Sequence, residues 1–260
     1  VVIDGTQVFD PSQISNSFDF NSIPLQQIER IEILKGGQST LWGSDAVAGV
    51  IQIFLKKEAK KKIAINSGIS YGTYNTTRIV AGASGTLDKL GYNVQYNYIK
   101  SKGFSTAYDS TGKKNFDNDG FEQNNVQASL NYKLNTSLTA KAFGNFSIYR
   151  TGYDAGAFID DKDYTAKNSN KLGGLSLQYK GKDFVWNIQG GYQRAERTFT
   201  NDSTDISSIY SKYSEGKYTG NTTTWETFGN KTLTRHLSLV VGIQYINQNT
   251  NQSYFSTGAF

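Results

Sequence analysis

The stretch VQASLNYKLNTSLTAKAFGNFSI, residues 126–148, decides the fold because its apolar and polar residues alternate on both sides of a short break. Successive side chains of a β-strand point to opposite faces, so this period of two predicts strands with one apolar face. The apolar positions are Val126, Ala128, Leu130, Tyr132 and Leu134, then Leu138, Ala140, Ala142, Gly144, Phe146 and Ile148. The break at 135–137, Asn-Thr-Ser, is typical of a tight turn.

The same alternation continues through the chain after residue 62 and predicts nine strands, near 63–71, 77–86, 90–101, 122–134, 138–150, 171–180, 184–199, 222–233 and 237–249. From the second turn onward, short and long connections alternate. The tight ones fall at 87–89, 135–137, 181–183 and 234–236, and the long ones at 102–121, 151–170 and 200–221. Every second connection of an up-and-down sheet lies at the same rim. The long loops therefore share one rim, which is the layout of an outer-membrane barrel.

Composition agrees with a membrane barrel. Hydrophobic residues make up only 37% of the chain, too few for a large dry core, and 26 Gly against 2 Pro favours strands and turns. Aromatic residues near predicted strand ends are consistent with interfacial girdles; they are Tyr132, Tyr179, Phe184, Trp186, Tyr192 and Tyr245. A soluble β-sandwich is the alternative, but it has no reason to sort its loops by length.

Several other function classes find no support in the sequence. The absence of Cys excludes disulfides, thiol chemistry and cysteine metal sites. The single histidine, His236, lies at a tight turn, and Ser39, Ser44 and Asp45 have no His nearby, so we expect no enzyme. The net charge is +5, but the basic run KKEAKKK at 56–62 lacks interleaved aromatics, so we expect a connector and no nucleic-acid partner.

The nine strands are not expected to close by themselves. An open sheet leaves two unpaired edges, which lipid does not tolerate. A small barrel is filled by its own side chains and has no room for the separate unit that precedes the strands. The expected fold is therefore all-β: part of a larger up-and-down antiparallel transmembrane barrel at 59–260, preceded by a different domain at 1–58.

One long connection resembles a calcium loop. In KKNFDNDGFEQ, residues 113–123, Asn115, Asp117 and Asp119 alternate and Gly120 follows, as in the opening of an EF-hand loop. Position 12 of such a loop should be a bidentate Glu, but Val126 occupies it. Asp and Asn also favour ordinary turns, so the residues alone leave both interpretations open.

The segment IPLQQIERIEILKGGQSTLWGSDAVAGVIQIFLKK, residues 23–57, resembles the end of the plug domain of TonB-dependent outer-membrane transporters. The matching elements are the strand I-x-R-I-E-x-L-K-G, the aromatic-Gly-Ser at 42–44, and A-x-A-G-V-I-x-I; VVIDG at the start fits the same domain. Gly37 departs from the proline that the family commonly has there. The resemblance implies that residues 1–58 are the C-terminal part of a plug and that the barrel has about 22 strands.

The resemblance also implies a bacterial outer-membrane location and uptake of a large nutrient. The expected partners are outer-membrane lipids, a surface lipoprotein, and an inner-membrane TonB complex that pulls on an N-terminal segment missing from this chain. Within the family, the chain resembles the cobalamin transporters at GSDAVAGV (43–50), DNDGF (117–121) and YDA (153–155). Two rivals are a receptor for a ferric siderophore or haem and, more distantly, a β-rich surface adhesin that uses calcium structurally.

In the cobalamin transporters two neighbouring loops bind calcium, so no Glu at position 12 is needed. Carried over by position, the expected calcium ligands are Asn115, Asp117, Asp119, Tyr153 through its backbone, Asp154, and one or both of Asp160 and Asp161. A further acidic residue of the family corresponds to Ser105, with Asp109 as a stand-in. The expected substrate contacts are Ile14, Ser15, Asp154 and Ala155.

Overall fold

The chain folds into two β-sheets joined by a short basic connector. The computed structural model describes residues 1–13, 15–37, 42–43, 46–112, 116–202, 204 and 213–257. One sheet has four strands and the other has nine. Among the described residues, no helix combines the length and the apolar character needed to cross a bilayer.

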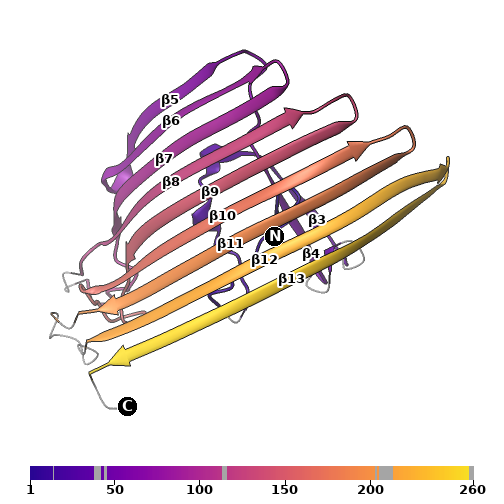
Figure 1. The fold of residues 1–260 in the computed structure, drawn as a ribbon. Helices are drawn as coiled ribbons and strands as arrows, with labels where there is room; N and C mark the ends of the chain where they lie inside the picture. Colours follow the sequence, from indigo (N-terminus) through magenta and orange to yellow (C-terminus); the bar gives the residue numbers. More distant parts are fainter. Residues whose placement is uncertain are drawn as a thin grey trace.

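The larger sheet is an antiparallel meander in which each strand pairs with the next in sequence, in the order β13 to β5. Its strands are β5 (Ala64–Gly72), β6 (Thr76–Leu87), β7 (Leu90–Phe104), β8 (Asp119–Lys133), β9 (Leu138–Gly152), β10 (Tyr164–Lys180), β11 (Phe184–Asn201), β12 (Ser214–Thr234) and β13 (Leu237–Ser256). A 3-10 turn, η3 (Thr73–Asn75), joins β5 to β6. Figure 1 shows a single curved sheet with β5 and β13 at its edges. The nine predicted strands and their up-and-down order are confirmed.

From the β6–β7 turn onward, tight turns and long connections lie at opposite ends of this sheet, as the sequence predicts (Figure 1). The short turn η3 lies at the end with the long connections. The β8–β9 turn is stabilised by Asn135, whose Oδ1 accepts hydrogen bonds from the backbone N–H groups of Ser137 at 2.8 Å and Leu138 at 2.9 Å. The β6–β7 turn places Asp88 at a φ of 52°, a conformation that Asp tolerates better than most residues. We call the other end, where the connections are long, the loop rim.

The predicted strand ends at the loop rim are wrong by several residues. Strand β10 begins at Tyr164 instead of near 171, and β12 begins at Ser214 instead of near 222. The outward residues cease to be apolar there, but the backbone ladder continues, since Asn201 pairs with both Tyr164 and Ser214. Strands that extend beyond the apolar layer keep their hydrogen bonds without keeping the alternation. The observed connections are therefore shorter than predicted, at 105–118, 153–163 and 202–213.

The two faces of the larger sheet differ sharply in polarity. One face is apolar and exposed, with Val94 46%, Leu130 49% and Trp186 43% exposed. The other face carries buried amides and hydroxyls; among them are Asn93, Gln95, Asn97, Gln123, Asn125, Gln127, Asn145, Ser147, Asn168, Asn170 and Gln193. This arrangement reverses that of a soluble protein and matches a barrel with a lipid-facing exterior and a polar interior.

The smaller sheet is formed by β1 (Val2–Ile3), β2 (Thr6–Gln7), β3 (Ile28–Lys35) and β4 (Gly49–Leu55) in the order β2-β1-β4-β3. Two 3-10 turns, η1 (Phe20–Ser22) and η2 (Leu25–Gln27), precede β3. Its core contains the buried side chains of Ile3, Val8, Phe18, Ile23, Ile53 and Leu55, together with Leu172 from β10. Because one core residue comes from the other sheet, this small domain completes its core only by docking.

The smaller domain docks on the polar face of the larger sheet, mainly through hydrogen bonds. Gln189 on β11 donates to the backbone oxygen of Gly5 at 2.9 Å, and the backbone N–H of Phe9 donates to Gln193 Oε1 at 3.0 Å. Asn145 on β9 donates to Gln27 Oε1 at 3.1 Å. The indigo segments of Figure 1 lie against this one face of the sheet. The domain therefore occupies the interior that the larger sheet curves around.

Candidate functional site

Two long connections meet at the loop rim. Segment 105–118 joins β7 to β8, and segment 153–163 joins β9 to β10. The two strands that separate these segments in the sequence, β8 and β9, are directly paired. The backbone N–H of Tyr108 donates to the carbonyl of Ala157 at 2.7 Å and joins the two connections. Strand pairing therefore brings together carboxylates that are distant in sequence.

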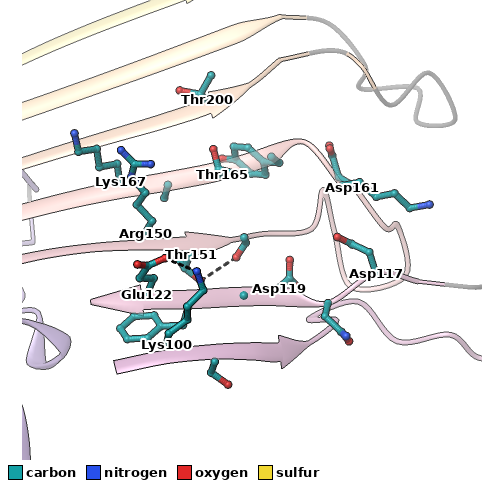
Figure 2. A pocket seen from close by; sticks show the side chains of 18 of the residues that line it. Lys100, Asp117, Asp119, Glu122, Arg150, Thr151, Asp161, Thr165, Lys167 and Thr200 are labelled. Carbon is teal, nitrogen blue, oxygen red and sulfur yellow. Dashed lines mark hydrogen bonds and ion pairs between the residues drawn. The ribbon is translucent and has the colours of Figure 1, made fainter. Parts of the chain in front are cut away.

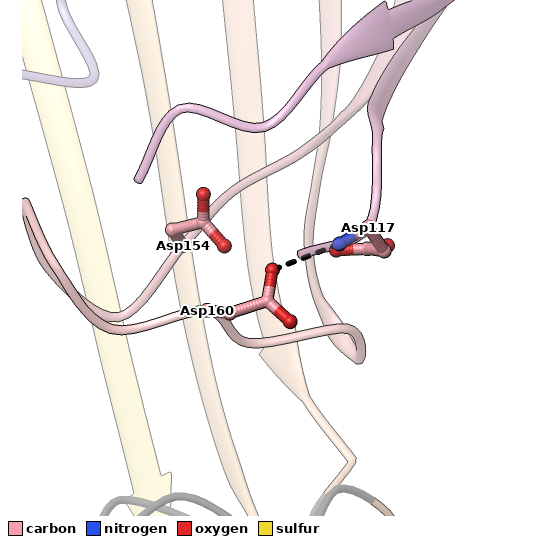
Figure 3. A group of neighbouring side chains, drawn as sticks. All are labelled: Asp117, Asp154 and Asp160. Carbon is pink, nitrogen blue, oxygen red and sulfur yellow. Dashed lines mark hydrogen bonds between the residues drawn. The ribbon is translucent and has the colours of Figure 1, made fainter. Parts of the chain in front are cut away.

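Three aspartates from these connections converge (Figure 3). Asp117, Asp154 and Asp160 each offer one carboxylate oxygen, and these oxygens lie within 4.8 Å of one another. The backbone N–H of Asp117 donates to Asp160 Oδ1 at 3.1 Å, which holds the two connections in register. We call these three residues the aspartate triad. Three carboxylates at this spacing repel one another unless a proton or a cation neutralises them.

Asp154 is held by donors from the opposite connection. Its Oδ2 accepts hydrogen bonds from Ser105 Oγ at 3.1 Å, Thr106 Oγ1 at 2.9 Å and the Ala107 backbone N–H at 2.5 Å. Its Oδ1 accepts one from the Asp161 backbone N–H at 3.0 Å. Burial alone would raise the pKa of Asp154, but these hydrogen bonds to the charged form outweigh it and lower the pKa.

Asp117 has the opposite electrostatic character. Burial, followed by the nearby charge of Asp160, raises its pKa to about 6. Its Oδ1 is buried and, among the described residues, has no hydrogen-bond partner. Because a buried acceptor without a partner is costly, this oxygen is the group that a bound cation would satisfy.

Asp161 lies beside the triad but is held by another strand. It is 2% exposed, and its Oδ2 accepts a hydrogen bond from Asn201 Nδ2 on β11 at 2.8 Å. Burial, followed by hydrogen bonding to Asp163, raises its pKa to about 6. Its Oδ1 has no partner among the described residues.

These residues fit a hard divalent cation. Calcium takes six to eight oxygen ligands and accepts irregular geometry, so carboxylates from two loops suit it better than magnesium. The triad supplies three carboxylates, with Asp161 adjacent. The described part of the chain offers no second group of three acidic or imidazole side chains at metal-binding spacing.

The other predicted ligands have different surroundings. Asp119 accepts a hydrogen bond at Oδ2 from the Thr106 backbone N–H at 2.6 Å, so this carboxylate braces the 105–118 connection. The ring of Tyr153 lies 6.0 Å from that of Tyr164 and 6.1 Å from that of Phe199. Asn115 lies outside the described residues. Ser105 contacts Asp154, whereas the Oδ1 of its proposed stand-in, Asp109, accepts from the Thr111 backbone N–H at 2.9 Å.

Of the predicted substrate contacts, Ser15 is exposed and accepts a hydrogen bond from Ser17 Oγ at 3.0 Å. Ala155 follows Asp154 and is half-buried. Ile14 lies outside the described residues. All four predicted contacts, including Asp154, remain predictions.

Sequence reasoning missed an aromatic wall on the inner side of the loop rim. Besides its contacts with Tyr153, Phe199 lies 5.9 Å from Tyr218, and below them Tyr149 donates to Asp19 Oδ2 at 2.5 Å. Tyr164, Phe199 and Tyr218 have inward parity, opposite to that of the lipid-facing residues on the same strands. Continuing the inward–outward alternation along each strand beyond its last apolar outward residue would have identified these three aromatic residues as inward-facing.

The architecture is that of an outer-membrane β-barrel segment with a plug domain in its interior. Residues 1–50 match the family model of the TonB-dependent receptor plug domain. The chain resembles the TonB-dependent receptors in carrying plug sequence followed by nine barrel strands. This match and the exposed apolar exterior indicate an outer-membrane protein, and we refer to the two sheets as plug and barrel from here on.

Individual relatives agree with this assignment. The chain is 26% identical over 217 residues to a vitamin B12 transporter of Vibrio cholerae, covering 83% of this chain and 34% of that protein. The chain therefore spans about a third of the length of the curated relative that it matches. Among solved structures, the copper transporter OprC superposes with a TM-score of 0.79 at 14% identity, covering 97% of this chain and 38% of that one. The ferric yersiniabactin receptor FyuA of Yersinia pestis gives 0.71 at 16% identity, covering 89% and 38%.

Proposed function

We propose that the full-length receptor takes up cobalamin or a related corrinoid across the outer membrane, and that calcium at the aspartate triad orders the loops that receive it. One observation carries the calcium part: Asp117, Asp154 and Asp160 place carboxylate oxygens within 4.8 Å of one another from two separate connections. The cargo part rests on the relative from Vibrio cholerae, which is described as a vitamin B12 transporter.

Calcium would act by replacing repulsion with coordination. Without a cation, the charges of Asp117 and Asp160 oppose each other across the two connections. A divalent ion between them would attract both, and it would also satisfy the buried Oδ1 of Asp117. In this proposal the cation joins 105–118 to 153–163 and fixes the rim around the cargo, with Asp119 and Asp161 beside it.

Energy for uptake would come from outside this chain. The plug is docked mainly by hydrogen bonds, with Gln189 and Asn145 donating and Gln193 accepting, and water can replace these bonds when the plug moves. The movement would also separate Leu172 from the plug core. We propose that an inner-membrane TonB complex supplies this energy by pulling on the full-length receptor. The same proposal gives the chain no catalytic role, in line with relatives described as transporters and receptors.

A ferric siderophore or haem is the second candidate cargo, because the solved neighbour FyuA is by name an uptake receptor for a ferric ligand, ferric yersiniabactin. The aromatic wall of Tyr153, Tyr164, Phe199 and Tyr218 would suit any large planar ligand. A surface adhesin does not account for the plug domain match at residues 1–50.

The test is a binding titration on the full-length receptor in detergent, with cobalamin or ferric siderophores, in calcium and after chelation. We expect tight cobalamin binding that weakens on chelation and in an Asp117→Asn/Asp154→Asn/Asp160→Asn variant. Asp88→Asn is the control, because Asp88 lies in the β6–β7 turn at the opposite end of the sheet from the triad, and Asn tolerates its φ of 52°. Direct calcium binding is measured separately by calorimetry. Calcium binding without cobalamin binding would support the triad as a calcium site but contradict cobalamin as the cargo. Binding of a ferric siderophore in the same titration would then identify the second candidate cargo.

A further inference from the structure

One face of strand β11 contacts both the plug and the residues beside the aspartate triad. Gln193 Oε1 accepts a hydrogen bond from the plug backbone, and four positions further along, Arg197 pairs with the plug carboxylate of Asp10. Another four positions along, Asn201 Nδ2 donates to Asp161 Oδ2 at 2.8 Å. Positions that differ by an even number share one face of a strand, so these three β11 side chains all project from its inward face.

Asp161 extends the last of these contacts to the triad. Its carboxylate accepts from Asn201, and its backbone N–H donates to Asp154 Oδ1 at 3.0 Å. Asn201 is 6% exposed and Asp161 is 2% exposed, so losing the hydrogen bond between them is costly. Asn201 therefore positions a residue that contacts the triad directly, although Asn201 itself lies outside the triad.

The segment of β11 between the plug contact and the triad contact is well braced. Arg197 and Asn201 are about 13 Å apart along the strand, at ~3.3 Å per residue. Both neighbouring strands, β10 and β12, pair with this segment without a register shift. Phe199 lies between the two residues on the same face, with its ring 6.1 Å from that of Tyr153 and 5.9 Å from that of Tyr218. We therefore expect the segment to move as a unit.

The plug contact at the lower end of this segment is also buried. The Asp10 carboxylate is enclosed by the plug, and Arg197 supplies its counter-charge from the barrel wall. A buried carboxylate that loses its partner is strongly destabilised, so this ion pair restrains both the plug and the strand. Release of the plug at Asp10 removes that restraint from the same strand that carries Asn201.

An ion would reach the triad from the other side of the sheet. A cavity of about 660 Å³ is lined by Asp117 and Asp161, and Figure 2 shows both at its loop end. Its lining continues along Glu122, Arg150 and Lys167, which are in-register partners on the lipid-facing side of β8, β9 and β10. The plug docks on the inward face, so the sheet separates this cavity from it. An influence of the ion on the plug has to pass through the barrel wall.

We propose that β11 couples calcium binding at the aspartate triad to docking of the plug, with Asn201 and Arg197 as the two positioning residues. The proposal rests on the proposed function, in which calcium is the ligand of the triad. Bound calcium holds segment 153–163 where Asp161 meets Asn201, and a docked plug holds Arg197 on Asp10. Both contacts restrain the loop-rim end of β11 in one arrangement, so each favours the other.

This coupling gives the loop rim a defined role in uptake. While the plug is docked, calcium holds the two connections around the cargo. When the plug leaves Arg197, the calcium affinity falls and the connections loosen, so that release of the cargo follows movement of the plug. Linkage makes the effect reciprocal: the factor by which a docked plug strengthens calcium binding equals the factor by which calcium strengthens docking, usually about 5 to 150.

The test uses the full-length receptor in detergent and has two readouts. Calcium affinity is measured by calorimetry, and docking is measured as hydrogen exchange of plug residues 8–13 with and without saturating calcium. In the wild type we expect calcium to slow this exchange about tenfold. Arg197→Gln, whose ion-pair partner lies in the plug, should weaken calcium binding by a similar factor. Asn201→Ala should remove the effect of calcium on residues 8–13.

The matched control is Thr198→Ala/Thr200→Ala. These residues lie on the same segment with outward parity, so both readouts should stay unchanged. Calcium binding by the wild type without slower exchange of 8–13 would overturn the coupling and leave the calcium site intact. So would unchanged calcium affinity in Arg197→Gln, or calcium protection of the plug that persists in Asn201→Ala.

The wild-type comparison needs no variant, so it decides the question even if a substitution prevents folding. A wild-type receptor that binds no calcium would contradict the proposed function itself, and the coupling with it. The two failures are therefore distinguishable in one set of measurements.

Discussion

Arg197 on β11 forms an ion pair with Asp10 of the plug, through Nη2 and Oδ2, across 187 positions of sequence. The Asp10 side chain is 2% exposed and that of Arg197 is 19% exposed. Asp10 also accepts hydrogen bonds from the Ser12 backbone N–H and from Gln13 Nε2, both at 3.0 Å. Asp10 therefore organises the plug segment 8–13 and ties it to the barrel wall at the same time.

Replacing Arg197 with Gln should release this segment. The substitution leaves the buried carboxylate of Asp10 without a counter-charge, which typically costs about 3–5 kcal/mol. Hydrogen exchange of residues 8–13 in the full-length receptor should then be faster. Asp10→Asn combined with Arg197→Gln should recover much of the lost protection, because no unpaired charge remains. Unchanged protection in the single variant would show that the pair does not hold the plug.

Gly220 on β12 should tolerate no side chain. A Cβ there would overlap the backbone carbonyl of Pro11 and lie 2.5 Å from the Ser12 nitrogen. Gly220→Ala must therefore push the plug segment away, at about 1–3 kcal/mol, as overpacking usually costs. Proteolysis of residues 8–13 should become faster. Gly144→Ala is the control, since the nearest atom to its Cβ, the Leu172 oxygen, is 3.9 Å away; equal proteolysis in both variants would contradict the prediction.

Two buried amides on β8 should respond oppositely to substitution by Leu. Asn125 is fully buried and donates to the Ser22 oxygen of the plug at 3.0 Å. Asn125→Leu leaves this buried oxygen without its donor and should destabilise docking by about 1–3 kcal/mol. Gln127 is 1% exposed, and its side-chain amide has no partner among the described residues. Gln127→Leu should therefore be neutral or stabilising. Thermal unfolding of the two full-length variants, measured side by side, checks the contrast.

The stability of the folded connections 105–118 and 153–163 should depend on pH in the absence of calcium. The pKa values of Asp117 and Asp161 are raised from 3.8 to about 6, so between pH 4 and 6 the folded loops bind more protons than unfolded ones. Stability must therefore fall as pH rises through that window. Protection of 153–163 against hydrogen exchange, measured relative to the intrinsic exchange rate at each pH, should be lower at pH 7 than at pH 4, and Asp117→Asn/Asp161→Asn should flatten this dependence.

Calcium should reverse the effect of deprotonation, because the cation binds the charged carboxylates. At pH 7, about 1 mM calcium should restore protection of 153–163 in the wild-type receptor, in the affinity range of extracellular calcium modules. The same addition should have little effect on Asp117→Asn/Asp154→Asn. Protection that rises with pH in calcium-free buffer would contradict the assigned direction of both pKa shifts.

The barrel was predictable because its signals are local. The alternation at 126–148 depends only on side chains that point to opposite faces of one strand, and the loop sorting depends only on the parity of connections. Strand ends at Tyr164 and Ser214 were not predictable in this way, because beyond the lipid layer both faces are polar while the ladder continues. The boundary predicted at 58/59 falls in the connector between Leu55 and Ala64.

The site was predictable only in part. The two acidic connections could be paired from the sequence, because β8 and β9 had to be neighbours. Which carboxylates meet could not: Asp117, Asp154 and Asp160 converge, whereas Asp119 binds the Thr106 N–H and Asp161 binds Asn201. Those choices depend on how each connection turns, and no periodicity constrains an irregular segment.

By itself, the sequence determined an antiparallel barrel segment with a plug sequence before it, because strand alternation, turn chemistry and motif order act between near neighbours. Only the tertiary structure decided which distant residues meet. The Arg197–Asp10 pair, the aspartate triad and the Asn201–Asp161 contact all depend on exact strand register and on the docking of the plug. A one-residue change of register would move each of these side chains to the opposite face without altering the alternation that specifies the strands.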